Sequence, residues 1–123
     1  MSQVLAYVGA SVVALWGVAH ALPTGRVVAG FADTSADNRL VVAQEWVAEA
    51  VTMWFVAALV IGVTVIGRPN ETADWVYRAS AVLLVVLGAL TAATGARTPV
   101  VFFKICPVVM VVCAGLLLGA SWA

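Results

Sequence analysis

Charged residues are scarce in this sequence. Asp, Glu, Lys and Arg together make up 10% of its 123 residues, whereas hydrophobic residues make up 64%. A soluble domain carries about 25% charged residues, so this chain cannot cover a water-exposed surface and belongs to the membrane class. Its six basic and six acidic residues balance, which leaves no basic surface for nucleic acid.

Residues that hold metals and cofactors are also few. His20 is the single histidine, and Cys106 and Cys113 are the two cysteines. Seven residues apart on one expected helix, these cysteines lie about 10 Å apart, too far for a disulfide. Dinucleotide, phosphate-loop, zinc and nucleophile-elbow patterns are absent from the sequence. We therefore expect no metal and no cofactor.

Four hydrophobic runs are each long enough to cross a membrane. They cover residues 4–22, 39–66, 73–95 and 100–122, and segments rich in Gly, Pro and polar residues separate them. The sequence therefore predicts an all-α fold, an integral membrane antiparallel four-helix bundle that forms one domain over residues 1–123.

Two features of the last run bear on its packing. Pro107 either kinks the helix or marks its true start, and a kinked helix is the favoured interpretation. Gly115-x-x-x-Gly119 predicts a face on which another helix packs closely.

Connectivity gathers the polar residues at one end of this bundle. In a four-span bundle, the end of the first helix and the start of the second lie on the same side as the end of the third and the start of the fourth. That side holds most of the ionisable side chains: His20, Arg26, Asp33, Asp37, Arg39, Glu45, Glu49, Arg97 and Lys104. Charges at the entrance of a membrane helix are costly unless they are paired, hydrated or functional. We therefore expect the functional site at this end.

Helical register defines the candidate site. Glu45, Glu49 and Thr52 fall at i, i+4 and i+7 of the second helix, and Trp16 and His20 fall at i and i+4 of the first. Histidine exchanges protons near neutral pH, and a proton donor beside an apolar cavity suits acid–base chemistry on a lipophilic molecule. The expected catalytic residues are Glu49, Glu45, His20, Asp37 and Arg39. The expected substrate-binding residues are Trp16, Trp46, Asn38, Thr52 and Lys104.

Each of these residues also has a purely structural interpretation. The two glutamates could pair with cations of the same end and fix helix packing, and His20 could be a hydrogen-bonded helix-end residue. Trp46 could be a packing residue or an interfacial anchor. Asp37 and Asn38 are suited to capping the second helix. The cations available for pairing are Arg39, Arg97 and Lys104.

A set of short motifs resembles a group of small four-span bacterial membrane proteins of unassigned function. The motifs are His20-x-x-Pro23-Thr24, Gly30-Phe31, Asp37-Asn38-Arg39, Glu45-Trp46-x-x-Glu49 and Arg97-Thr98 with Lys104-x-Cys106-Pro107. The resemblance spans nearly the whole chain and implies no activity. Membrane-bound sterol isomerases and terpene cyclases also set carboxylates and tryptophans in a helical bundle, which is an architectural analogy without a motif match.

These observations favour an integral membrane enzyme that isomerises, cyclises or opens the epoxide of an isoprenoid or polyketide. The alternatives are an accessory subunit of a membrane complex and a small transport protein, although the polar residues stop after Thr52. We expect a lipophilic small molecule, membrane lipid and a second copy of the chain as partners, and no nucleic acid. We expect a multi-pass protein of the cell membrane. The positive-inside rule would place the polar end in the cytoplasm, but the count is a tie if Arg39 and Lys104 are site residues.

Overall fold

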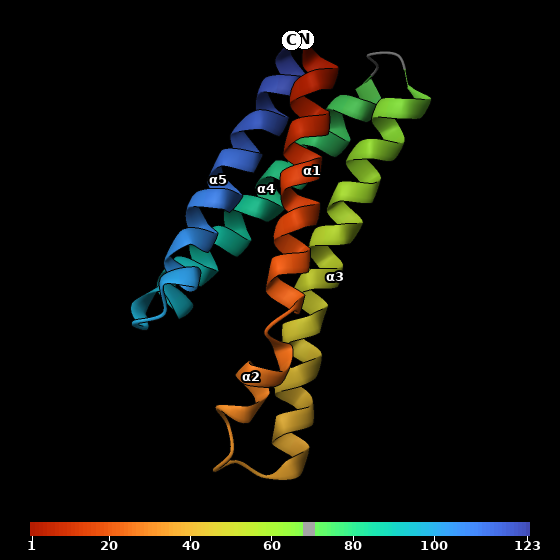
Figure 1. Cartoon of the computed structure of the whole chain (residues 1–123). Helices are drawn as coiled ribbons and strands as arrows, with labels where there is room; N and C mark the ends of the chain where they lie inside the picture. Colours follow the sequence, from red (N-terminus) through yellow and green to blue (C-terminus); the bar gives the residue numbers. More distant parts are fainter. Residues whose placement is uncertain (68–70) are drawn as a thin grey trace.

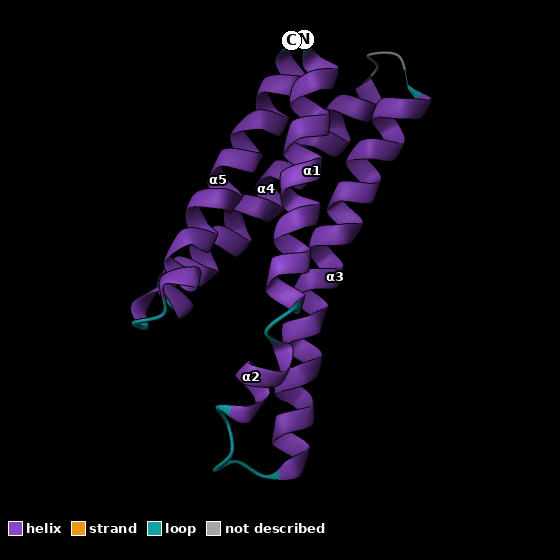
Figure 2. Ribbon diagram, in the orientation of Figure 1, coloured by secondary structure: helices purple, strands orange, loops and turns teal. Residues whose placement is uncertain are grey.

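The computed structural model describes residues 1–67 and 71–123. Within these residues the chain is all-α (Figure 2), with five α-helices and one short 3-10 helix. Their bounds are α1 (Ser2–Ala21), α2 (Thr24–Ala29), α3 (Ala36–Ile66), α4 (Glu71–Ala93), η1 (Gly95–Arg97) and α5 (Val101–Trp122). The predicted all-α fold is confirmed.

Four of these helices are candidate membrane spans. α1, α3, α4 and α5 are each long and apolar enough to cross a bilayer. Large apolar side chains such as Leu15, Phe55, Val86 and Val108 are exposed on their outer faces, where lipid would cover them. The fold is therefore that of a multi-pass membrane protein with four spans, as the hydrophobic runs predict.

α3 is longer than a membrane crossing requires. Its 31 residues extend about 46 Å, against a hydrocarbon core of roughly 30 Å. The Ser35 hydroxyl caps its start by accepting a hydrogen bond from the Asn38 backbone N–H at 3.2 Å. The short helix α2, which the sequence did not predict, lies beside this first part of α3 (Figure 1).

The core lies where α1 packs against α3 and α5, and where α4 packs against α5. Val13, Met53, Leu84, Met110 and Leu117 are almost completely buried there. These are medium-sized apolar side chains from all four spans, so the middle of the bundle is filled by hydrocarbon.

Glycines allow the helices to approach closely at positions other than the predicted one. A Cβ atom on Gly88 of α4 would lie 3.2 Å from the Met110 Cβ atom, and one on Gly17 of α1 would lie 2.7 Å from the Trp54 Nε1 atom. Gly115 has open space around it, and Gly119 meets only a Leu5 methyl group. The prediction of a Gly115-x-x-x-Gly119 packing face is therefore wrong within this chain, because its register turns Gly115 outward.

α5 begins at Val101 and runs through Pro107 without a break. The interpretation that Pro107 lies inside a helix is confirmed, and the alternative start at Pro107 is wrong. A proline in a helix leaves the carbonyl four residues earlier without its usual partner. Here the carbonyl four residues earlier belongs to Phe103, in the first turn of α5.

The two helix pairs diverge toward one end of the molecule. In Figure 1 both termini lie side by side at the top, and the α4–α5 pair swings away from the α1–α3 pair toward the bottom. That lower end carries α2 and η1, and it is the end to which the sequence assigns the polar residues.

Candidate functional site

His20 and Trp46 join α1 to α3 at the point where the helix pairs separate. The Trp46 indole Nε1–H donates a hydrogen bond to the His20 carbonyl at 2.8 Å, and the His20 Nε2 atom lies 3.1 Å from the Trp46 carbonyl oxygen. Their rings stack with centroids 4.0 Å apart and planes 17° apart. Because a carbonyl oxygen can only accept, the His20 Nε2 atom carries the proton.

Glu49 completes this group from the next turn of α3. Its Oε2 atom lies 3.6 Å from the His20 Nε2 atom, and this is the one contact within 4 Å between an acidic and a basic side chain among residues 1–67 and 71–123. The His20 side chain is 4% exposed, whereas the Glu49 side chain is 29% exposed. The imidazole N–H thus points at a backbone carbonyl, and a carboxylate with access to the cavities described below lies beside it.

An aromatic wall connects this group to α5. Trp46 meets Phe103 edge to face with ring centroids 5.7 Å apart, and Phe102 meets Phe103 in the same way at 6.1 Å. Phe102 also stacks on Trp16, at 4.7 Å and 9°. The Trp16 indole N–H points at the Cys106 sulfur, 3.4 Å away. These contacts hold the first turns of α5 near α1 and α3.

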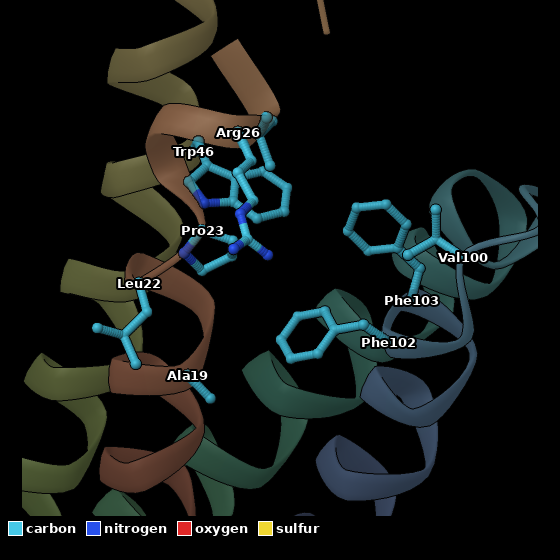
Figure 3. Close-up of a pocket in the computed structure, with 9 residues that line it drawn as sticks. Ala19, Leu22, Pro23, Arg26, Trp46, Val100, Phe102 and Phe103 are labelled. Atoms are coloured by element: carbon cyan, nitrogen blue, oxygen red, sulfur yellow. The ribbon is translucent and has the colours of Figure 1, made fainter. Parts of the chain in front are cut away.

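Three adjoining cavities surround the Trp46–Phe103 contact. The inner cavity, about 160 Å³, is lined by His20, Trp46, Glu49, Thr91, Thr94, Gly95, Phe102, Phe103 and Cys106. The wide cleft, about 880 Å³, lies between the α2–α3 side and the α4–α5 side, and its walls include Glu45, Trp46, Glu49, Thr52, Leu87, Thr91 and Phe103. The side cavity (Figure 3), about 490 Å³, is lined by Ala19, Leu22, Pro23, Arg26, Val27, Trp46, Val100, Phe102 and Phe103. Trp46 and Phe103 belong to all three cavities.

The structure brings together six of the ten residues expected at the site. They line the inner cavity, line the wide cleft or form the aromatic wall: Glu49, Glu45, His20, Trp16, Trp46 and Thr52. Glu45 is exposed and has no ion pair among the described residues, and the Thr52 hydroxyl donates to the Ala48 carbonyl.

The other four residues lie away from the three cavities. Asp37 precedes Glu49 by twelve residues, about 18 Å along α3, and Asn38 lies beside it in the capped first turn. The Arg39 guanidinium donates to the Ala32 and Thr34 carbonyls and so holds the loop before α3. Lys104 is exposed, because Phe102, Phe103 and Cys106 take the cavity-facing positions of the α5 helix. Of the charged and imidazole side chains expected at the site, His20, Glu45 and Glu49 therefore line these cavities, and Asp37, Arg39 and Lys104 do not.

Several cavity residues were not among the expected site residues. Phe102 and Phe103 supply one wall of the side cavity, and Arg26 supplies a charge on the opposite wall. Thr91 and Cys106 close the inner cavity from α4 and α5. The adjacent pair Phe102 and Phe103, three and four residues after Pro99, could have indicated the aromatic wall in the sequence.

Among the described residues, no group of three or more His, Cys, Asp or Glu side chains could hold a metal ion. Comparison of the chain with protein-family models, with curated proteins and with solved structures gives no match. The site is therefore interpreted from its own geometry, as a carboxylate–imidazole pair at the inner end of a largely apolar cleft in a four-span membrane protein.

Proposed function

We propose that this chain is an enzyme of the cell membrane that binds a lipophilic molecule in the wide cleft and rearranges it by acid–base chemistry. Isomerisation, cyclisation and epoxide opening are the reactions of this class. The observation that carries the proposal is the pair formed by His20 and Glu49, 3.6 Å apart, at the junction of the inner cavity and the wide cleft.

The cleft suits a lipophilic ligand. Its volume of about 880 Å³ lies in the range of roughly 300–1,000 Å³ that takes small-molecule ligands, and its walls are mostly hydrocarbon and aromatic. Three of its polar residues, Glu45, Glu49 and Thr52, form one stripe of α3, and Arg26, Thr91 and Thr94 are the other polar residues of its lining. An apolar chamber with a small number of convergent polar groups is the usual form of a binding site.

The chemistry requires no external oxidant or reductant. In a double-bond shift, the Glu49 carboxylate removes a proton from one carbon and the resulting acid returns a proton to another carbon. The His20 imidazole lies 3.6 Å from this carboxylate, and the Trp46 contacts fix the imidazole in that place. In a cyclisation or epoxide opening, the protonated Glu49 side chain donates first and takes a proton back at the end.

Two alternatives receive less support from the contacts. If the glutamates only braced the helices, they would meet Arg39, Arg97 or Lys104, yet no such ion pair occurs in the described part of the chain. If the chain conducted ions by itself, polar groups would continue across the bundle. Instead Val13, Met53, Leu84 and Met110 fill its middle.

Deuterium exchange tests the proposal directly. The protein in lipid nanodiscs is incubated in deuterated water with a total lipid extract of the source membrane, and the lipids are analysed by mass spectrometry. We expect a lipid species that gains deuterium or changes its retention time with the wild-type protein and not with Glu49→Gln. Identical lipid profiles for the two proteins would overturn the proposal.

A further inference from the structure

Arg26 faces the side cavity without a protein partner. It lies on α2, one turn after Pro23, and lines both the side cavity and the wide cleft. Figure 3 shows its guanidinium pointing into the gap between Pro23 and Trp46 on one wall and Phe102 and Phe103 on the other. Among residues 1–67 and 71–123, no carboxylate lies within ion-pair distance of it.

The surroundings of this guanidinium are apolar. Leu22, Val27, Val100, Phe102 and Phe103 supply hydrocarbon and aromatic surface around it. Glu45 and Glu49 share the wide cleft with Arg26, and neither forms an ion pair with it. Arg26 is exposed at this end of the bundle, so either water or an anion can compensate its charge beside these apolar walls.

An arginine recognises a particular kind of anion. Its planar fork of N–H donors matches the two oxygens of a carboxylate, or those of a phosphate, through paired hydrogen bonds. A hydrocarbon chain attached to that anion would contact the phenylalanines on the facing wall. From there the wide cleft, which shares Arg26, Trp46 and Phe103 with the side cavity, leads to Glu49.

We infer that these cavities bind a free lipophilic carboxylic acid, with its carboxylate on Arg26 and its chain along Trp46, Phe102 and Phe103. The inference rests on the proposed function in one respect, that this acid is the molecule on which Glu49 acts. The two cavities, about 490 and 880 Å³, have the size of small-molecule sites, which favours a free acid over the headgroup of a bilayer phospholipid as the occupant.

Binding of a conjugated polyene fatty acid, followed by its fluorescence, tests the inference without any measurement of turnover. The matched probe is the polyene alcohol of the same chain. In nanodiscs of zwitterionic lipid, we expect the wild-type protein to bind the acid more tightly than the alcohol. Arg26→Gln should weaken binding of the acid about tenfold, or about 1.4 kcal/mol, because it removes hydrogen bonds to a charged group. Binding of the alcohol should stay the same.

Arg97→Gln is the control variant. Arg97 is an exposed arginine of the same end that does not line the three cavities, so its loss should leave binding of both probes unchanged. Arg26→Lys keeps the charge and loses the paired geometry, and it should recover part of the affinity for the acid. Thermal unfolding of each variant in detergent verifies that the fold is intact.

Three results would overturn the inference. The acid and the alcohol could bind equally well to the wild-type protein. Alternatively, Arg26→Gln and Arg97→Gln could weaken binding of the acid equally. Anionic phospholipid added to the nanodiscs could also remove the preference for the acid, which would make a phospholipid headgroup the occupant. Arg26-dependent binding of the acid to the wild-type protein, without any Glu49-dependent lipid change, would refute the proposed function alone.

Discussion

Trp46 donates its indole N–H to the carbonyl of His20, 2.8 Å away, in the last turn of α1. The last carbonyls of a helix lack partners within it, so this tryptophan caps α1 from the neighbouring helix. In return the His20 imidazole lies against the Trp46 carbonyl. The residue whose imidazole lies beside the Glu49 carboxylate is therefore also part of the joint between α1 and α3.

Trp46→Phe should destabilise the protein by more than a comparable change elsewhere on α3. It leaves the His20 carbonyl without a donor, which costs about 1–3 kcal/mol for a buried group. Trp54→Phe is the matched control, because Trp54 donates to the Ala14 carbonyl in the middle of α1, where the helix supplies a second donor. Thermal unfolding in detergent should show the larger loss for Trp46→Phe, and equal losses would contradict the capping role.

α4 and α5 approach each other closely at Gly88, which predicts that a larger residue there will destabilise the protein. Gly88→Leu would force a side chain against Met110 and the Pro107 backbone, 3.2 and 3.5 Å from the position of the new Cβ atom. Overpacking of this kind costs about 1–3 kcal/mol. Gly115→Leu adds the same side chain where no atom lies within 4 Å, so it should leave the unfolding midpoint nearly unchanged. If both variants unfold alike, the α4–α5 packing described above is incorrect.

Labelling of introduced cysteines tests the arrangement of the four spans. Replacement of Cys106 and Cys113, both buried, by Ser gives the background. Cysteine at Thr34, before α3, and at Thr98, before α5, should react with an impermeant maleimide from one side of the membrane. Cysteine at Gln3, in the first turn of α1, should react from the other side. Reaction of all three positions from the same side would rule out the four-span topology.

Hydrophobic runs were sufficient to predict the four spans, and connectivity was sufficient to predict that His20 and Glu49 share one end of the bundle. The short helix α2 could not be predicted, because Thr24–Ala29 contains a glycine and is too short for a helical pattern to show. That helix places Arg26 at the side cavity, so the position of Arg26 in the cavity lining was not predicted either. Asp37 was assigned to the site because it is acidic and nearby in sequence, but the length of α3 moves it away.

Glu49→Gln separates catalysis from packing at the candidate site. Glutamine has nearly the size of glutamate and can occupy the same place beside His20, but it has no exchangeable acid proton. If Glu49 transfers protons, turnover should fall about 10²–10⁴-fold, the usual contribution of a general acid or base. The unfolding midpoint should hardly change, because the Glu49 side chain is partly exposed and His20 keeps its contacts with Trp46.

Glu45→Gln provides the comparison for that experiment. Glu45 lies one turn nearer the start of α3, lines the same wide cleft and is exposed. Removing its charge should alter turnover much less, because it makes no ion pair with His20 or with any other described residue. Equal losses in the two variants would show that the total negative charge of the cleft matters and not the proton on one residue. Full turnover in Glu49→Gln, with or without a change in unfolding midpoint, would remove Glu49 from the mechanism, and the His20–Glu49 contact would then be a feature of helix packing.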